Sequence, residues 1–365
     1  AAKELISFLL KKINTKVYII MTEDSFEKVT DFGNLYIAYK KARQGKGSKD
    51  SKARFGSVAL DGIYQLKKML DEKSYDVGKY TEFKVYDPKE RVIQAGNFKD
   101  KIVQHSLCDN ALIPLLKNEF IRTNYAGQVN KGTDYGLSCL QAQMCLAYFK
   151  YGYECWIIKA DIGKFFYSID HDILKDIVRY FVMDDDTYWL CEKFINSISG
   201  VGLPLGNQVS QVYALLYLSG LDHFITGELG VEYYGRYMDD FYLIVQSKEY
   251  AKWCLMCIRE FVNSINLTLN GKTQIIPFKN GIKFCGFHTY VTSNGKVICK
   301  LDNKKKRKNL KKYRRMAKLV RESKLSKEKF LESYQSTKNH FSKGNCIKFT
   351  YEMDKMIKKI LEETK

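Results

Sequence analysis

The spacing of apolar residues separates helical segments of the chain from strand-like ones. Apolar positions three or four residues apart mark one buried face of a helix. This spacing predicts a helix followed by a short apolar stretch at 1–20, and a helix that runs from Ser25 to a Gly-rich basic loop. It also predicts helices at 57–74, 97–121 and 250–265, and helices that begin at about Asp134, Asp170 and Ser210. Runs of β-branched and aromatic residues bounded by turn residues predict strands at 81–96, 156–160, 231–247 and 282–291. These patterns together predict an α+β fold.

The strand-like stretch 231–247, VEYYGRYMDDFYLIVQS, carries two adjacent carboxylates, Asp239 and Asp240. The runs on either side have strand composition and predict a hairpin, and the near-continuous apolar run after the acids predicts a second strand buried on both faces. Two acids at a turn between buried strands repel each other, and unpaired buried charge is costly. A divalent metal is the natural partner. An ordinary polar turn is the alternative, since Asp is common in turns.

A third carboxylate follows a different strand. The apolar run 156–160 delivers Asp161 at its end, and the chain then turns towards a helix that begins near Asp170. Asp161 could simply cap that turn. If it lies beside Asp239 and Asp240, the three acids form the smallest cluster that holds two Mg²⁺ ions against phosphate oxygens.

Polar and small residues elsewhere predict contacts to a nucleotide. The Gly- and Pro-rich loop that begins near 198 would let a nucleobase approach closely, and Asn207 or Gln211 could hydrogen-bond to it. The hairpin predicted at 81–96 has a positive edge that could meet a triphosphate. Lys272 is predicted at a turn, either as a surface lysine or as an acid that faces phosphate. Gly286 is predicted at the centre of the strand 282–291, where a bulge or a close backbone approach is expected.

Charge narrows the class of partner. The 365 residues carry a formal net charge of +19, and most of the excess lies in 301–365, which holds 21 Lys or Arg against 8 Asp or Glu. A helical, solvated surface would have this composition, but a positive field of this size also attracts polyanions, of which nucleic acid is the commonest. A membrane surface is disfavoured because the basic run lacks a large apolar face.

Cysteine usage and hydropathy predict a cytoplasmic protein. The ten cysteines form no disulfide framework and suit a reducing compartment. The single CxxC pair, Cys254 and Cys257, follows helical periodicity, which favours core packing over zinc binding. No apolar run reaches about 18 residues, and the start of the chain lacks a convincing signal peptide.

The motifs, in this order, resemble those of reverse transcriptases. DIGKFF, GLPLGNQVSQ, YMDDF, LNGKT and FCGF resemble the successive palm motifs of that family, and RVIQAGNFKDKIVQHSLC resembles its fingers segment. The resemblance covers roughly 25–350 and implies a right-hand polymerase with an antiparallel palm sheet. The implied parts are an N-terminal extension at 1–20, fingers at 21–152, a palm at 153–300 and a helical, basic thumb at 301–365.

The resemblance also implies a role for individual residues. Metal binding is implied for Asp161, Ile162, Asp239 and Asp240, with two Mg²⁺ ions, or Mn²⁺ in their place. Lys272 would protonate the leaving pyrophosphate, and Phe166 would exclude a 2′-hydroxyl. The implied nucleotide-binding set is Lys84, Lys89, Arg91, Phe166, Leu205, Gly206, Asn207 and Gln211. The implied primer grip is Phe284, Cys285 and Gly286, where Cys285 replaces the usual leucine.

Leu205 separates subfamilies, because retroviral and group II intron enzymes usually carry glutamine at this position. Leucine followed by GNQVSQ resembles the reverse transcriptases of diversity-generating retroelements. This implies copying of an RNA template into cDNA with errors at template adenines, aided by a structured retroelement RNA and a small oligomeric accessory protein.

Other classes remain open. Abortive-infection reverse transcriptases share overlapping motifs, whereas a group II intron enzyme is less expected because no maturase, nuclease or RNase H segment is recognisable after the thumb. A two-metal nuclease, a primase-like or DNA-templated polymerase and a catalytically silent nucleic-acid-binding module are the remaining alternatives.

Overall fold

A computed structural model describes residues 25–44, 55, 58–86 and 90–362. The helix predicted at 1–20 and Lys89 lie outside the described residues. The chain divides into two units, each built from several segments. The first unit comprises Ala1–Gly127, Asp161–Gly230 and Met256–Lys272, and the second comprises Gln128–Ala160, Val231–Leu255 and Thr273–Lys365. Each unit mixes helices with antiparallel strands, so the α+β class is confirmed.

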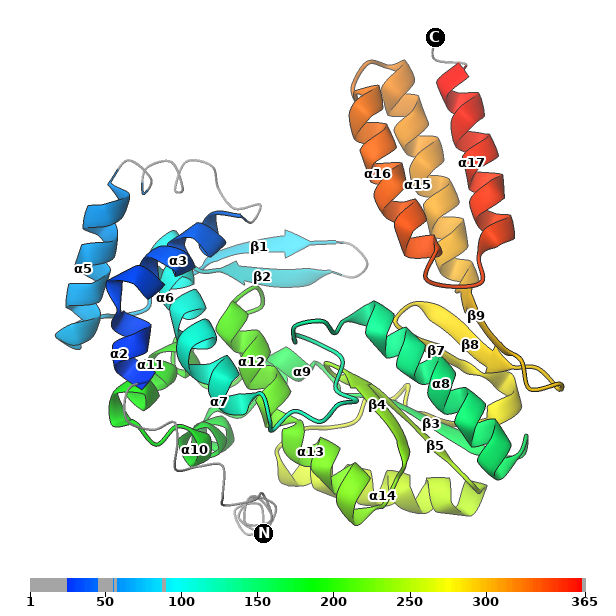
Figure 1. Cartoon of the computed structure of the whole chain (residues 1–365), viewed down its shortest axis with the longest axis horizontal. Helices are drawn as coiled ribbons and strands as arrows, with labels where there is room; N and C mark the ends of the chain where they lie inside the picture. The colour runs from blue at the N-terminus through cyan, green and yellow to red at the C-terminus, as the bar shows by residue number, and fades with distance from the viewer. Residues whose placement is uncertain (1–24, 45–54, 56–57, 87–89, 363–365) are drawn as a thin grey trace. The chain divides into compact units, whose positions relative to one another are not determined.

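The first unit is mainly helical (Figure 1). Its elements are α2 (Ser25–Thr30), α3 (Phe32–Arg43), α5 (Ala59–Asp71), β1 (Thr81–Val85), β2 (Arg91–Ala95), α6 (Phe98–Leu107), the π-helical η2 (Cys108–Leu112), α7 (Ile113–Leu116), α9 (Phe165–Ser168), α10 (His171–Phe181), α11 (Asp185–Ile195), α12 (Gln208–Tyr217), α13 (Ser219–His223) and the π-helical η3 (Phe224–Glu228). The helix predicted from Ser25 is two helices. It is broken at Asp31, whose extended backbone ends α2 and whose side chain caps α3 by accepting from Asn34 N.

The core of the first unit forms where α6 packs against α3 and α12. Every residue of α12 from Val209 to Tyr217 is buried except Gln211, so this helix is apolar on nearly all sides. Figure 1 shows α12 between α6 and α9. The helix predicted from about Ser210 is therefore confirmed, and it begins two residues earlier, at Gln208.

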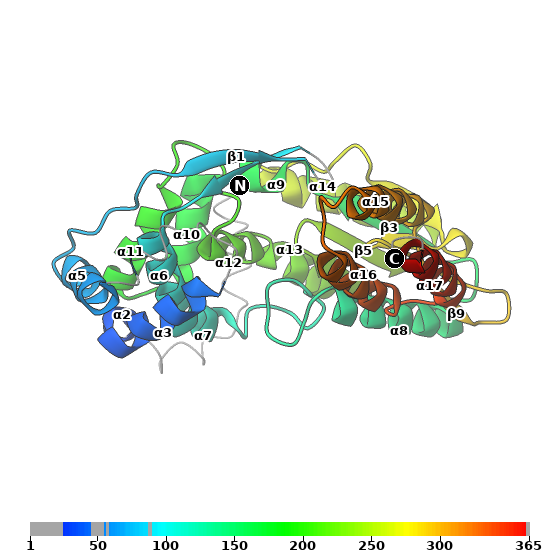
Figure 2. The ribbon, with the colours of Figure 1, turned by 90° about the horizontal axis from the view of Figure 1, so that it is seen from above.

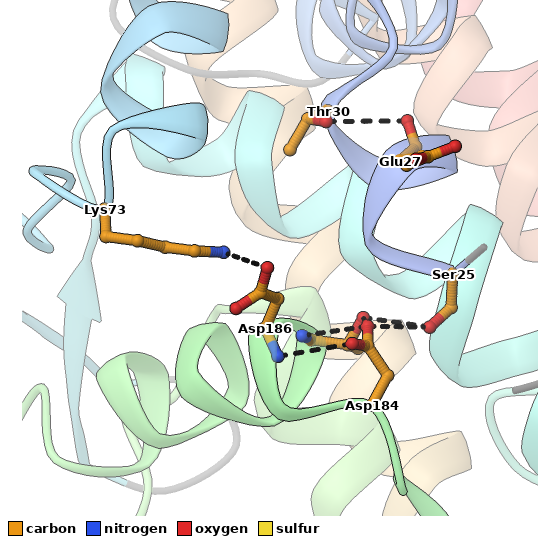
Figure 3. A network of polar contacts seen from close by, with 7 residues as sticks. Ser25, Glu27, Thr30, Lys73, Asp184 and Asp186 are labelled. Carbon is orange, nitrogen blue, oxygen red and sulfur yellow. Dashed lines mark hydrogen bonds and ion pairs between the residues drawn. The ribbon is translucent and has the colours of Figure 1, made fainter. Parts of the chain in front are cut away.

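Polar contacts fix the start of α2 to the start of α11 (Figure 3). Ser25 Oγ donates to Asp184 Oδ2 at 3.1 Å, and Asp184 also caps α11 by accepting from the backbone of Asp186 and Thr187. Lys73 Nζ lies 2.9 Å from Asp186 Oδ2. These contacts join α2 and Lys73, just after α5, to the N-terminus of α11, in a later segment of this unit.

The second unit contains two antiparallel sheets. The four-stranded sheet has the order β4 (Tyr233–Tyr237), β5 (Asp240–Val245), β3 (Trp156–Asp161) and β6 (Gln274–Pro277), and the three-stranded sheet has the order β7 (Ile282–Phe284), β8 (Phe287–Val291) and β9 (Val297–Leu301). The short 3₁₀ helix η4 (Phe278–Asn280) joins β6 to β7. The helix α8 (Thr133–Tyr151) contacts strands of both sheets. The helix α14 (Lys248–Ser264) starts in this unit. Among the described helices, none is long and apolar enough to cross a bilayer.

The prediction of one strand over 282–291 is wrong. Two strands, β7 and β8, pair antiparallel with Phe284 opposite Phe287, and Cys285 and Gly286 form a two-residue turn between them. Both turn residues have positive φ, 47° and 85°, as a type I′ turn requires. The buried positions shift by one across the turn, from Ile282 and Phe284 in β7 to Phe287, Thr289 and Val291 in β8.

The C-terminal part of the second unit is a three-helix bundle, formed by α15 (Asn303–Arg321), α16 (Lys327–Phe341) and α17 (Ile347–Glu362). Figures 1 and 2 both show these helices side by side. Their buried residues form one apolar cluster that includes Tyr313, Phe330 and Met353. Tyr334 and Lys338 of α16 both contact Asp354 of α17 within 2.9 Å. The helical character predicted for 301–365 is confirmed for the described residues.

Candidate active site

The hairpin predicted at 231–247 is present as β4 and β5. Tyr237 pairs with Asp240, so Met238 and Asp239 form a two-residue turn. Met238 has φ +56°, and positive φ at the first of two turn residues characterises a type II′ turn. Because side chains other than Gly rarely adopt this conformation, the turn stores backbone strain next to the predicted acids. The second strand is buried from Phe241 to Val245, as predicted.

A fully buried arginine donates a hydrogen bond to this turn. Arg236 has no exposed surface, and its Nη1 donates to the carbonyl of Met238 at 2.9 Å. A guanidinium keeps its charge in a protein, so its burial costs free energy unless its N–H groups are hydrogen-bonded. The bond to Met238 therefore holds the carbonyl that immediately precedes Asp239.

A second cation faces Asp240. Lys159, on the neighbouring strand β3, forms an ion pair with the Asp240 carboxylate. The Lys159 side chain is only 14% exposed, and its ammonium also lies 5.2 Å from the centre of the Phe284 ring. The Asp240 carboxylate thus lies where a positive charge is held. The divalent metal expected beside these acids stays a prediction.

Asp161 is the last residue of β3 and belongs to the first unit. Its carbonyl accepts from Asn270 N at 2.7 Å, and its Oδ2 accepts from Asn270 Nδ2 at 3.2 Å. The next residue, Ile162, forms an isolated bridge with Leu269 and is buried, so only its carbonyl could serve as a metal ligand. Lys272 is exposed in a turn two residues after Asn270.

The loop predicted to admit a nucleotide lies against Phe166. Leu203 N donates to Phe166 O at 2.6 Å, and Gly202 N donates to Ile169 O at 2.8 Å. At Gly202, φ is +97° and a Cβ would stand 3.0 Å from Phe166 O, so a side chain is excluded there by both conformation and space. The Phe166 ring itself is half-buried and meets Phe165 edge to face.

The β1–β2 hairpin joins the same loop from its other side. Gln94 N donates to Leu205 O at 3.2 Å, and Gly206 lies against Ile93. Asn207 is buried, and its Nδ2 donates to Tyr80 Oη at 2.9 Å. The first unit therefore brings together three predicted parts of a nucleotide site that are far apart in sequence.

Other predicted nucleotide contacts lie on the surface. Lys84 forms an ion pair with Glu90 at 2.8 Å, with both side chains more than half exposed. Arg91, at the start of β2, and Gln211, in the first turns of α12, are exposed. Because they are exposed, Arg91 and Gln211 are accessible to a ligand. Lys84 would have to break its ion pair with Glu90 before it could bind a phosphate.

The predicted primer grip forms the β7–β8 turn. Phe284 is buried and meets Tyr242 edge to face at 5.0 Å between ring centres. Burial raises the pKa of Cys285 to about 11, although Lys159 and Lys305 oppose the rise. A Cβ at Gly286 would collide with the Lys305 side chain, so Lys305 covers the turn. Burial also lowers the pKa of Lys305.

Sequence reasoning missed Lys159, Arg236 and Asn270. Lys159 and Asp161 lie two residues apart on one strand, and residues with this spacing share a face of the sheet. Asn270 stands inside the motif LNGKT, but its partner Asp161 is more than 100 positions away.

A complete metal-binding cluster is not seen among the described residues, where no group of three or more His, Cys, Asp or Glu side chains lies close enough to hold an ion. Asp161 belongs to the first unit, and Asp239 and Asp240 belong to the second. The donor chemistry is nevertheless suitable, since carboxylate oxygens are the ligands that Mg²⁺ prefers.

Comparison with known proteins gives the family. The family model described as "Reverse transcriptase (RNA-dependent DNA polymerase)" matches residues 87–289, more than half of the chain. A curated relative, the "Putative COX1/OXI3 intron 2 protein" of Saccharomyces cerevisiae, is 27% identical over 240 residues, which cover 60% of this chain and 26% of the relative. The chain thus spans about a quarter of that relative's length. From the matched segment, the chain belongs to the reverse transcriptase family.

Proposed function

We propose that this reverse transcriptase serves a diversity-generating retroelement and makes errors at template adenines. The observation that carries the proposal is Leu205, an aliphatic residue where retroviral and group II intron enzymes usually have glutamine. Leu205 is half-buried, and its carbonyl accepts from Gln94 N at 3.2 Å. Its side chain therefore stands on a loop braced by β2 and by the Phe166 segment, and a small change there would alter how a template–nucleotide pair is held.

The proposed chemistry is a two-metal nucleotidyl transfer with Asp161, Asp239 and Asp240 as ligands, joined by the carbonyl of Ile162. Divalent ions bound there would supply charge to activate the primer hydroxyl and to stabilise the triphosphate. The Met238–Asp239 turn presents one acid from a strained backbone, and Asn270 orients Asp161. Lys159 holds the charge of Asp240 balanced.

Other residues act on the nucleotide in this proposal. Phe166 blocks the space that a 2′-hydroxyl would occupy, and the basic residues of the β1–β2 hairpin, Lys84, Lys89 and Arg91, neutralise the triphosphate. Lys272 is exposed, and in this proposal it gives a proton to the leaving pyrophosphate. Positioning and charge neutralisation carry most of a phosphoryl transfer, so the protein needs no covalent step.

The proposed arrangement of parts follows the family. Fingers would span 21–152, the palm 153–300, and the thumb 301–365, which contains the basic helices α15, α16 and α17. Template RNA, primer and deoxynucleotides are implied by the family. A structured retroelement RNA and a small accessory protein are further proposed partners.

Sequencing of products tests the retroelement proposal. An RNA template with all four bases is copied by the wild-type chain, by Leu205→Gln and by the apolar control Leu205→Met. Wild type and Leu205→Met should concentrate misincorporation at adenines, and Leu205→Gln should reduce that bias by roughly tenfold, the effect of about 1.4 kcal/mol of discrimination. Wild-type errors spread evenly over the four template bases would contradict the proposal.

The similarity to a Saccharomyces protein named as an intron 2 protein favours a second candidate, an intron-type reverse transcriptase. The same experiment separates the two. Accurate copying that Leu205→Gln leaves unchanged would favour the intron-type enzyme.

A further inference from the structure

We propose that Asn270 is a positioning residue, which fixes the carboxylate of Asp161 and the turn that carries Lys272 in one arrangement. The inference rests on the proposed function, because it assigns a role relative to the metal ligand and the proton donor proposed above. All of its contacts lie within the first unit.

Backbone pairing places Asn270 beside Asp161. Gly163 N donates to Thr268 O at 2.8 Å, and Asn270 N donates to Asp161 O at 2.7 Å, with the Ile162–Leu269 bridge between them. This short antiparallel ladder pairs residues 161–163, at and just after the end of β3, with residues 268–270. The buried side chains of Ile162 and Leu267 anchor it.

The Asn270 side chain then links two functional groups. Its Nδ2 donates to Asp161 Oδ2 at 3.2 Å, and its Oδ1 accepts from Lys272 N at 3.1 Å. The orientation of the amide is unambiguous, because an ionised carboxylate can only accept and a backbone N–H can only donate. The second bond is an Asx turn, which fixes the backbone that leads into Lys272.

An amide suits this position for an electrostatic reason. A neutral donor holds one carboxylate oxygen in place and leaves the negative charge of Asp161 to a metal, unlike Lys159, which already balances charge on Asp240. Partners that orient a metal ligand in this way typically change metal affinity or activity about 10- to 100-fold when they are removed. Asn270 is therefore expected to act through Asp161 and Lys272 without touching substrate.

A purely structural role for Asn270 makes a different prediction. The two backbone hydrogen bonds of the ladder do not involve the Asn270 side chain, so Asn270→Ala should keep the local fold. Asn270→Ser separates the two side-chain bonds. A serine hydroxyl can still accept from the N–H two residues on, but it is too short to reach Asp161.

A matched control lies four residues earlier. Asn266 Nδ2 donates to Asp170 Oδ2 at 2.9 Å, an amide–carboxylate contact like that of Asn270, but Asp170 caps α10. Asn266 has φ +56°, so Asn266→Gly removes the contact without adding strain. Asp161→Ala serves as the reference for loss of the proposed metal ligand.

The experiment measures single-nucleotide incorporation against Mg²⁺ concentration, Mn²⁺ binding by electron paramagnetic resonance, and thermal unfolding for each full-length variant. Asn270→Ala and Asn270→Ser should lower kcat and weaken Mn²⁺ binding by about 10-fold or more. The KM for deoxynucleotide and the unfolding temperature should stay near the wild-type values. Asn266→Gly should match wild type in kcat and in Mn²⁺ binding.

Distinct results would overturn the inference. Wild-type kcat and Mn²⁺ binding in Asn270→Ala would remove any positioning role, and a normal Asn270→Ser beside an impaired Asn270→Ala would remove the link to Asp161. If the kcat and Mn²⁺ binding of Asn270→Ala fall together with its unfolding temperature, the role of Asn270 is structural alone. If Asp161→Ala incorporates nucleotides normally, the proposed site itself is wrong. An inactive Asp161→Ala with normal Asn270 variants refutes only this inference.

Discussion

At the scale of residues, two of the three predicted acids, and the turn beside the third, each have a polar partner in the structure. Lys159 faces Asp240, and Asn270 holds Asp161. Asp239 and Asp240 stand out in the sequence because adjacent carboxylates between apolar runs are unusual, and their role as ligands stays a prediction. The contacts of their partners could not be predicted, because local spacing puts Lys159 and Asp161 on one face of β3 but does not say which distant residue either side chain meets.

Phe166 gives the most specific test at this scale. Phe166→Ala should admit ribonucleotides, because the ring is proposed to fill the space of a 2′-hydroxyl. The preference for deoxynucleotides, measured as the ratio of kcat/KM values, should fall by roughly 10- to 100-fold, the range for a steric pocket contact. Its exposed neighbour is a control: Tyr167→Ala should leave the preference unchanged. A Phe166→Ala enzyme that still rejects ribonucleotides would refute the role of the ring.

At the scale of elements, hairpins were predicted at the right places where turn residues interrupt the apolar runs. Both β1–β2 and β4–β5 pair antiparallel around the predicted turns. The β7–β8 hairpin was missed because Cys285 adopts a positive φ. A positive φ cannot be predicted from the presence of a cysteine, since residues other than Gly rarely adopt it. The break at Asp31 was missed for a related reason, since one capping side chain ended a continuous helical pattern.

Arg236 tests whether the β4–β5 turn works as one rigid element. Arg236→Met keeps the length of the side chain but removes the donor to Met238 O. The lost bond leaves a carbonyl without this donor, and we expect the free energy of unfolding to fall by about 1–3 kcal/mol. Incorporation should fall as well, because Asp239 follows the released carbonyl.

Denaturant unfolding and single-turnover incorporation measure the two effects. Arg236→Lys retains the charge but not the planar donor, and it should lie between wild type and Arg236→Met. An Arg236→Met variant with wild-type unfolding free energy and incorporation rate would show that the turn keeps its conformation without the Arg236 hydrogen bond.

At the scale of the whole molecule, the order and spacing of motifs along the chain were sufficient to predict the reverse transcriptase family, which the family match confirms. The pattern could not predict which distant segments meet. The contact between Gln94 and Leu205 joins residues more than 100 positions apart, and no local periodicity encodes such a pairing. The right-hand arrangement and the retroelement role remain proposals.

The most direct test of the central claim is incorporation of one deoxynucleotide on an RNA template with a DNA primer and Mg²⁺. The wild-type chain should extend the primer, and Asp239→Ala should lose incorporation by roughly 100-fold or more while unfolding at the wild-type temperature. Asp172→Ala, which alters an acid whose side chain is 93% exposed on α10, should extend normally. Sustained incorporation by Asp239→Ala on the RNA template would contradict the account.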